Sequence, residues 1–97
     1  MKMYVKAAPD PNTNSGYQDM YMNRIHTVIS RLRINDLDWD VKGNKFTLRY
    51  EGKVVIITYA NKQAKIQKVG SNTPINVDIT TNGILDIVKI SKAIRAI

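Results

Sequence analysis

The fold is decided by residues 37–67, which read LDWDVKGNKFTLRYEGKVVIITYANKQAKIQ. Large apolar side chains alternate with polar ones along this stretch, which is the period of a half-buried β-strand. Pairs of turn-forming residues interrupt the alternation at three points, namely Gly43-Asn44, Glu51-Gly52 and Asn61-Lys62. With a two-residue hairpin loop at each pair, the segment is predicted to fold into an antiparallel meander.

The same three turns predict the register of the meander. The expected facing pairs are Val41 with Phe46, Trp39 with Leu48, Leu37 with Tyr50, Leu48 with Val55, Phe46 with Ile57, Tyr59 with Ala64, and Ile57 with Ile66. All these apolar side chains then share one sheet face, and a slip of one residue would expose them. The sheet side of the predicted core is therefore Trp39, Phe46, Leu48, Val55, Ile57 and Ile66.

Helical periodicity lies on both sides of the meander. Before it, apolar residues at spacings of three and four predict a helix whose core-facing members are Ile25, Val28, Ile29 and Leu32. After it, residues 84–97 are ambiguous between strand and helix, and a helix accounts better for their spacing. That helix would place Ile84, Ile87, Val88, Ser91 and Ile94 on one side and Lys89, Lys92 and Arg95 on the other, with Thr80 or Thr81 as its N-cap.

Together these elements predict an α+β fold. It has an N-terminal helix, an antiparallel β-meander of three to four strands, and a C-terminal helix packed on one sheet face. Ile75, Val77 and Ile79 alternate with polar residues, which indicates a short additional edge strand. We assign residues 17–97 to a single α+β domain and residues 1–16 to an N-terminal strand and loop segment, with the strand over residues 3–7.

Composition limits the classes of function. The chain has 97 residues, no cysteine and one histidine, which excludes a thiol nucleophile and a histidine-rich metal site within it. His26 is expected at the surface of the first helix. The sequence also lacks a glycine-rich phosphate loop and a nucleophile elbow. We therefore expect a protein that is not an enzyme and needs no cofactor or metal. The longest apolar run, residues 54–57, is too short to cross a bilayer, so we expect a cytoplasmic location without membrane contact.

One acidic pattern suggests a different chemistry. Asp36, Asp38 and Asp40 alternate and would share one face of a strand, and three carboxylates suit a hard cation such as Mg²⁺. Followed by Glu51-Gly52-Lys53, they resemble the restriction-endonuclease-like nuclease core. That family holds its E-x-K within a strand, whereas Glu51-Gly52 is predicted here as a hairpin turn. The predicted register also sets Asp38 opposite Arg49, so cross-strand ion pairing is the competing interpretation.

The charge balance favours anionic partners. Fifteen Lys and Arg against eight Asp and Glu give a formal net charge of +7, which attracts polyanions at long range. The cations fall on the first helix with its C-terminal flank, on the sheet and on the last helix: Arg24, Arg31 and Arg33; Lys42, Lys45 and Lys65; and Lys89, Lys92 and Arg95. From these we predict a nucleic-acid-binding surface that consists of Arg31, Arg33, Lys89, Lys92 and Arg95.

The order of helix, strands and helix over residues 17–97 resembles the double-stranded-RNA-binding domain. The resemblance would place Lys89, Lys92 and Arg95 where the second helix of that family meets phosphates. The chain lacks the family's Gly-Pro-x-His and Lys-Lys-x-Ala-Lys motifs, so no family is assigned.

Three functions remain open from the sequence. The favoured one is a small basic binding protein that contacts nucleic acid or a nucleic-acid-handling protein complex. The second is a phage or mobile-element accessory protein that binds and inhibits a host protein. A self-associating structural or assembly protein, such as a homodimer, is the third. It is suggested by apolar residues on both faces of the predicted strand over residues 53–60.

Overall fold

The computed structural model describes residues 14–97, and the strand predicted over residues 3–7 lies outside this range. The elements are α1 (Asn14–Arg31), β1 (Asp38–Lys42), β2 (Lys45–Tyr50), β3 (Lys53–Ala60), β4 (Gln63–Lys68), β5 (Ile75–Asp78) and α2 (Gly83–Arg95). α1 thus begins inside the segment that the sequence assigned to a strand and loop. No helix within residues 14–97 is long and apolar enough to span a membrane.

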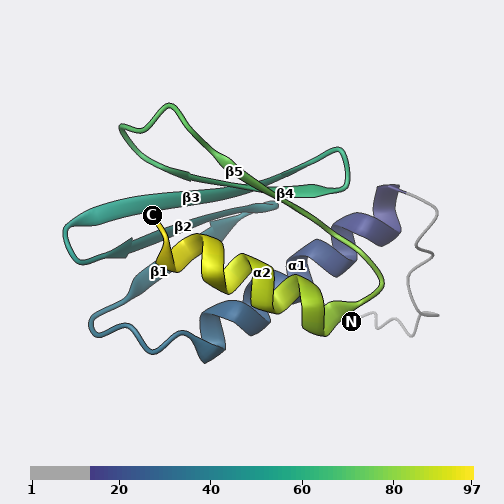
Figure 1. The fold of residues 1–97 in the computed structure, drawn as a ribbon, viewed down its shortest axis with the longest axis horizontal. Helices are drawn as coiled ribbons and strands as arrows, with labels where there is room; N and C mark the ends of the chain where they lie inside the picture. The colour runs from purple at the N-terminus through teal and green to yellow at the C-terminus, as the bar shows by residue number, and fades with distance from the viewer. Residues whose placement is uncertain (1–13) are drawn as a thin grey trace.

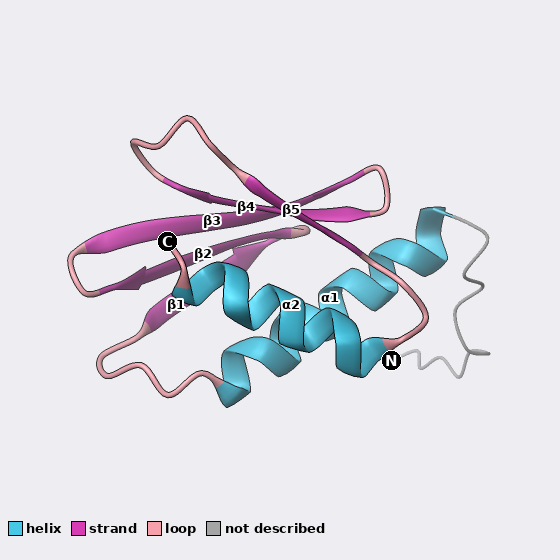
Figure 2. Ribbon diagram, viewed as in Figure 1, coloured by secondary structure: helices cyan, strands magenta, loops and turns pink. Residues whose placement is uncertain are grey.

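The strands form one antiparallel sheet in the order β1-β2-β3-β4-β5 (Figure 1). The predicted α+β fold is confirmed, and the sheet has five strands because the meander of four is extended by β5, the short edge strand that the sequence indicated. The fifth strand forms because Ile75–Asp78 pairs with β4, where Val77 lies opposite Ala64. Both helices lie on the same side of the sheet (Figure 2). Residues 14–97 therefore form two layers, in which the helices cover one sheet face; we call the other the open sheet face.

The predicted register is confirmed in each hairpin. Trp39 lies opposite Leu48, Phe46 opposite Ile57, and Ile57 opposite Ile66. Only the predicted pair of Leu37 with Tyr50 falls outside the ladder, because β1 begins at Asp38. The turns Glu51-Gly52 and Asn61-Lys62 have positive φ angles at both central residues. A type I′ turn requires such angles. This turn type suits hairpins because its twist matches that of the strands.

The turn Glu51-Gly52 supplies a test of backbone strain. Glu51 has a φ of 50°, where the Cβ of most residues crowds the backbone and Asn is better tolerated. Its ion pair with Lys53, at 3.7 Å, is exposed. We expect Glu51→Asn to raise the free energy of unfolding by up to about 1 kcal/mol, measured by urea denaturation. The matched control Gly52→Ala adds a Cβ at a φ of 75° and should lower it. Unchanged stability of Glu51→Asn would show that this turn stores no strain.

The core lies between the sheet and the two helices. Ile25, Val28, Ile29 and Leu32 cover the sheet as predicted, and Phe46 and Leu48 are fully buried beneath them. Tyr21 joins the layers, since its hydroxyl lies 2.6 Å from the Asn44 carbonyl oxygen and 3.1 Å from that of Ile57. Burial raises the pKa of Tyr21, so this phenol stays protonated as a donor.

Trp39 was predicted in the core, and this is wrong, because 37% of its surface is exposed. The register is not the cause, since Trp39 shares the covered sheet face with Leu48. β1 is an edge strand whose residues are all exposed, so the helices cover it only in part. Trp39 instead stacks on Phe46, with ring centroids 6.3 Å apart, and meets the edge of His26 at 5.8 Å. His26 itself is exposed, as expected.

The C-terminal segment is a helix as predicted, and its buried side was predicted in part, because Ile94 is buried and Ile87 packs against the core. The buried residues are Asp86, Ile90, Ala93 and Ile94, whereas Ile84 and Val88 are 79% and 45% exposed. The N-cap is Asn82, whose side-chain oxygen accepts from the Leu85 amide at 3.1 Å, and not Thr80 or Thr81. Two residues along a helix differ in direction by about 200°. Once Asp86 points inward, Val88 must therefore point outward.

Candidate nucleic-acid interface

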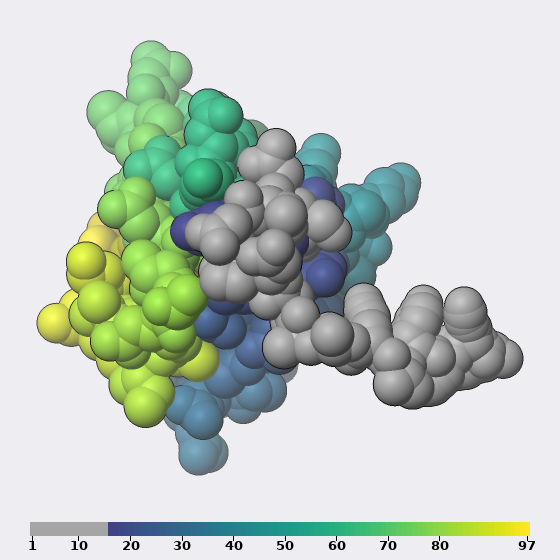
Figure 3. Space-filling model, turned by 90° about the vertical axis from the view of Figure 1, so that its right-hand side faces the viewer, coloured from purple at the N-terminus to yellow at the C-terminus, as the bar shows by residue number. Residues whose placement is uncertain are grey.

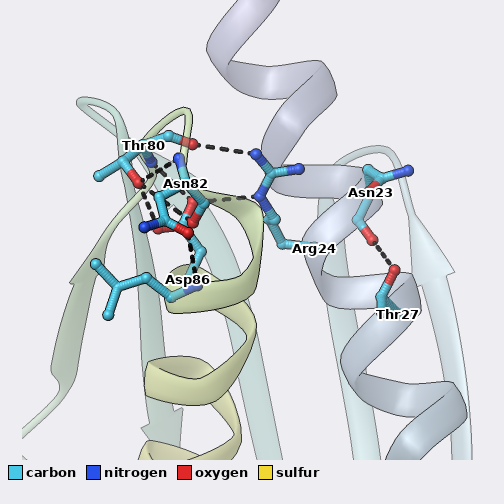
Figure 4. A network of polar contacts seen from close by, with 7 residues as sticks. Asn23, Arg24, Thr27, Thr80, Asn82 and Asp86 are labelled. Atoms are coloured by element: carbon cyan, nitrogen blue, oxygen red, sulfur yellow. Dashed lines mark hydrogen bonds and ion pairs between the residues drawn. The ribbon is translucent and has the colours of Figure 1, made fainter.

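A buried polar network at the start of α2 sets the direction of Asp86 (Figure 4). Arg24 of α1 donates from Nε to Oδ2 of Asp86 at 3.2 Å, and from Nη2 to the Thr80 carbonyl at 3.1 Å. The Asp86 carboxylate also accepts from the Thr80 amide at 2.8 Å and from its hydroxyl at 2.7 Å. A carboxylate that is 1% exposed is tolerated only with such pairing.

The network removes Arg24 from the set of available cations. Its side chain is 12% exposed and engaged with Asp86, so it holds the two helices together. Gly83 gives the guanidinium room, because a Cβ at that position would lie 3.1 Å from Cζ of Arg24. The sequence grouped Arg24 with the other cations of its helix, since helical spacing alone does not reveal a partner far along the chain.

The outer surface of α2 carries cations without acids. Lys89, Lys92 and Arg95 are all exposed, and none of them has an ion-pair partner within residues 14–97. The only acid of this helix is Asp86, which is buried and paired. Positions three residues apart differ in direction by about 60° from a full turn. The three cations therefore follow an oblique line across the outer face of the helix, and not a line parallel to its axis.

A further exposed cation, Arg31, is the last residue of α1. Arg24 faces α2, and Arg31 follows two turns later on the same side of α1. On α2, Lys89 lies about one turn after Asp86 and is exposed. The two helices are in contact, and Figure 3 shows the yellow-green surface of α2 bordering the blue surface of α1. Arg31 and Lys89 are therefore two exposed cations on helices that contact each other.

The other two predicted residues lie at or just after the ends of the two helices. Arg33 is exposed and follows the end of α1, so helical spacing does not place it relative to α2. Arg95 lines a hollow of about 190 Å³ at the end of the sheet, together with Tyr50 and Ile94. All five predicted residues are thus exposed, with Lys89, Lys92 and Arg95 on α2, Arg31 at the end of α1 and Arg33 just after it.

The open sheet face has a mixed charge. Lys42 lies opposite Lys45, and Lys65 lies opposite Thr58, so these three lysines share that face. Acids share it as well. Arg49 donates to Asp38 at 2.8 Å and to Asp40 at 2.9 Å, and hydrogen bonds with Asp40 and Asp38 raise the pKa of Arg49. With both signs interspersed, this face is less uniformly positive than the exposed side of α2.

The acidic pattern forms ion pairs instead of a nuclease centre. The predicted cross-strand pair of Asp38 with Arg49 is confirmed. Asp36 does not share the strand face, because it lies in the turn before β1 with a φ of 59°. Glu51 lies in a hairpin turn, so no E-x-K forms within a strand. Over the described range 14–97, no cluster of three or more acidic or histidine side chains is arranged to hold a metal.

One feature of the outer surface was missed from the sequence. Ile84, Leu85 and Val88 are 79%, 41% and 45% exposed, and we call them the aliphatic patch. Ile84 and Val88 were assigned to the core because their spacing is that of a buried stripe. The signal against this assignment was Asp86, an acid among apolar residues with Arg24 as its distant partner.

No protein-family model matches the chain, and neither a curated protein nor a solved structure matches it. The resemblance in element order to the double-stranded-RNA-binding domain is therefore carried no further. The function is argued below from the residues of this chain alone.

Proposed function

We propose that this protein binds nucleic acid through the outer surface of its helix layer, without catalysing a reaction. Arg31, Lys89 and Lys92 form the centre of this basic surface, and Arg33 and Arg95 extend it. The observation that supports the proposal most is the charge of α2, which exposes three cations while its single acid, Asp86, is neutralised by Arg24. Phosphates are the complementary groups, and cations held on a rigid helix can neutralise several of them at once.

The rest of the fold is consistent with this choice of surface. The open sheet face places Asp38 and Asp40 beside its cations, so a polyanion there would meet repulsion as well as attraction. Arg31 of α1 and Lys89 of α2 add exposed positive charges from two helices that contact each other. Contacts of this kind are made to the sugar-phosphate backbone and not to the bases. We therefore expect binding to depend only weakly on the base sequence.

Charge reversal at Lys89 and Lys92 tests the proposal. Binding of labelled duplex DNA, duplex RNA and single strands is measured by fluorescence anisotropy at several salt concentrations. The double variant Lys89→Glu, Lys92→Glu should bind more weakly for every sequence. Its log-log salt slope should fall by about one unit for each phosphate that the variant no longer neutralises. Because both side chains are exposed, the melting temperature should stay that of the parent.

The matched control is Lys42→Glu with Lys45→Glu on the open sheet face. It changes the net charge by the same amount, so it separates a local contact from the overall charge of +7. We expect this control to keep most of the affinity. Equal weakening in both double variants, or no binding by the parent at low salt, would contradict the proposal.

A further inference from the structure

The aliphatic patch is the feature that phosphate binding leaves unexplained. Ile84 is 79% exposed, although helix α2 buries four other residues on its inner side. Clustered exposed aliphatic side chains mark a surface that meets a partner. Cations bind phosphates without any need for neighbouring aliphatic groups, so the patch points to a second kind of contact on the same helix.

The patch and the basic surface are continuous along α2. Leu85 and Lys89 are four residues apart, as are Val88 and Lys92, so each aliphatic side chain is followed on the same side of the helix by a cation. Four residues correspond to a rise of about 6 Å. An aliphatic side chain and a cation on the same side of the helix are therefore close enough to contact neighbouring groups of one ligand.

We propose that Ile84, Leu85 and Val88 contact the sugars and base edges of a nucleic-acid duplex, while Lys89 and Lys92 bind the phosphates that flank the groove. This inference rests on the proposed function. It specifies the ligand of the protein as a nucleic-acid duplex that is deformed at a flexible base step. Aliphatic side chains inserted at such steps unstack them in part and widen the groove.

Two observations favour a duplex over a single strand. Single strands are bound mainly by stacking of their bases on aromatic side chains, and α2 contains no aromatic residue. The aromatic rings of Tyr21 and Phe46 lie buried in the core. An aliphatic surface beside fixed cations is instead the arrangement that duplex deformation uses.

A second copy of this chain is a poor occupant of the patch. A stable dimer buries about 800 Å² on each partner, which is far more than three side chains provide. Two copies would also bring together surfaces of a protein with a net charge of +7, and like charges oppose association. The complementary occupant of this helix is therefore an anion that also offers apolar surface.

The test compares the salt dependence of two kinds of variant. Ile84→Ser with Val88→Ser removes apolar contact and no charge. We expect it to weaken duplex binding by about tenfold at every salt concentration, with the log-log slope unchanged. Lys89→Gln with Lys92→Gln should reduce the slope instead. Val69→Ser is the matched control, because Val69 is also exposed, at 57%, but lies outside α2. It should bind as the parent does.

The ligand class is tested with two duplexes of equal length and charge. One contains flexible TA and CA steps and the other is a stiff A-tract. The parent should prefer the flexible duplex, and the Ile84→Ser, Val88→Ser variant should lose that preference. Equal binding of both duplexes by the parent, or parent-like binding by the variant, would overturn the inference while leaving phosphate binding intact.

Failure of the proposed function itself gives a different result. The parent would then bind no nucleic acid at low salt. A designed helical peptide with glutamates and leucines at four-residue spacing would reveal the other class of occupant. The parent would bind this peptide but no duplex. Both double variants of this test, Ile84→Ser with Val88→Ser and Lys89→Gln with Lys92→Gln, would lose the binding of the peptide. That result would overturn the inference in favour of an acidic protein partner.

Discussion

Arg24→Ala should lower the free energy of unfolding by about 3–5 kcal/mol, measured by urea denaturation. The substitution removes the ion pair with Asp86 and the hydrogen bond to the Thr80 carbonyl. It leaves the Asp86 carboxylate at 1% exposure without its counter-charge. The two hydrogen bonds from Thr80 remain, but they do not neutralise the charge. The uncompensated buried charge is therefore the main cost.

A double variant separates the buried charge from the loss of packing. Arg24→Met combined with Asp86→Asn removes both charges and keeps an oxygen that accepts from Thr80. It should be more stable than Arg24→Ala alone. Arg49→Ala is the surface control, because it breaks two ion pairs with Asp38 and Asp40 that solvent already screens, so its destabilisation should be smaller. A destabilisation by Arg24→Ala no larger than that by Arg49→Ala would contradict a structural role for the buried pair.

The ion pair of Arg24 with Asp86 affects both the stability of the fold and the candidate interface. Asp86 faces inward because Arg24 and Thr80 bind it, and this direction turns Val88 and Lys92 outward. Because Arg24 neutralises Asp86, no exposed acid offsets the cations of α2. A buried contact between the helices thus determines both the aliphatic patch and the charge of the proposed binding surface.

The register of the sheet could be predicted because local residues determine it. A two-residue turn leaves no freedom in which residues face each other, and Gly43, Gly52 and Asn61 mark the three turns. Alternation then assigns each side chain to a face. Exposure of Lys89, Lys92 and Arg95 was predictable for a related reason, since long charged side chains rarely lie fully buried.

The rotation of α2 could not be predicted in the same way. Apolar residues occur on every side of this helix, including Ile84, Val88, Ile90 and Ile94, so periodicity allows more than one buried face. The choice is made by Arg24, which is 62 residues away from Asp86. Burial of Trp39 likewise depends on how far the helices extend over β1. The sequence of β1 alone gives no information about that extent.

The second large effect is expected at Phe46, an aromatic residue in the core. Phe46→Ala should lower the free energy of unfolding by about 3–5 kcal/mol. Phe46 is fully buried, and its ring lies 6.0 Å from that of Tyr21 and 5.2 Å from that of His26. Truncation leaves a cavity between β2 and α1, at the centre of the core. Thermal and urea denaturation followed by far-UV circular dichroism measure the change.

Trp39 provides the comparison that makes this prediction specific. Its ring stacks on Phe46, yet 37% of its surface already meets solvent, so Trp39→Ala should cost only about 1–2 kcal/mol. The larger residue should therefore give the smaller destabilisation, because burial and not side-chain size determines the cost. An equal or larger destabilisation by Trp39→Ala would mean that edge strand β1 is covered in solution, which would place Trp39 in the core after all.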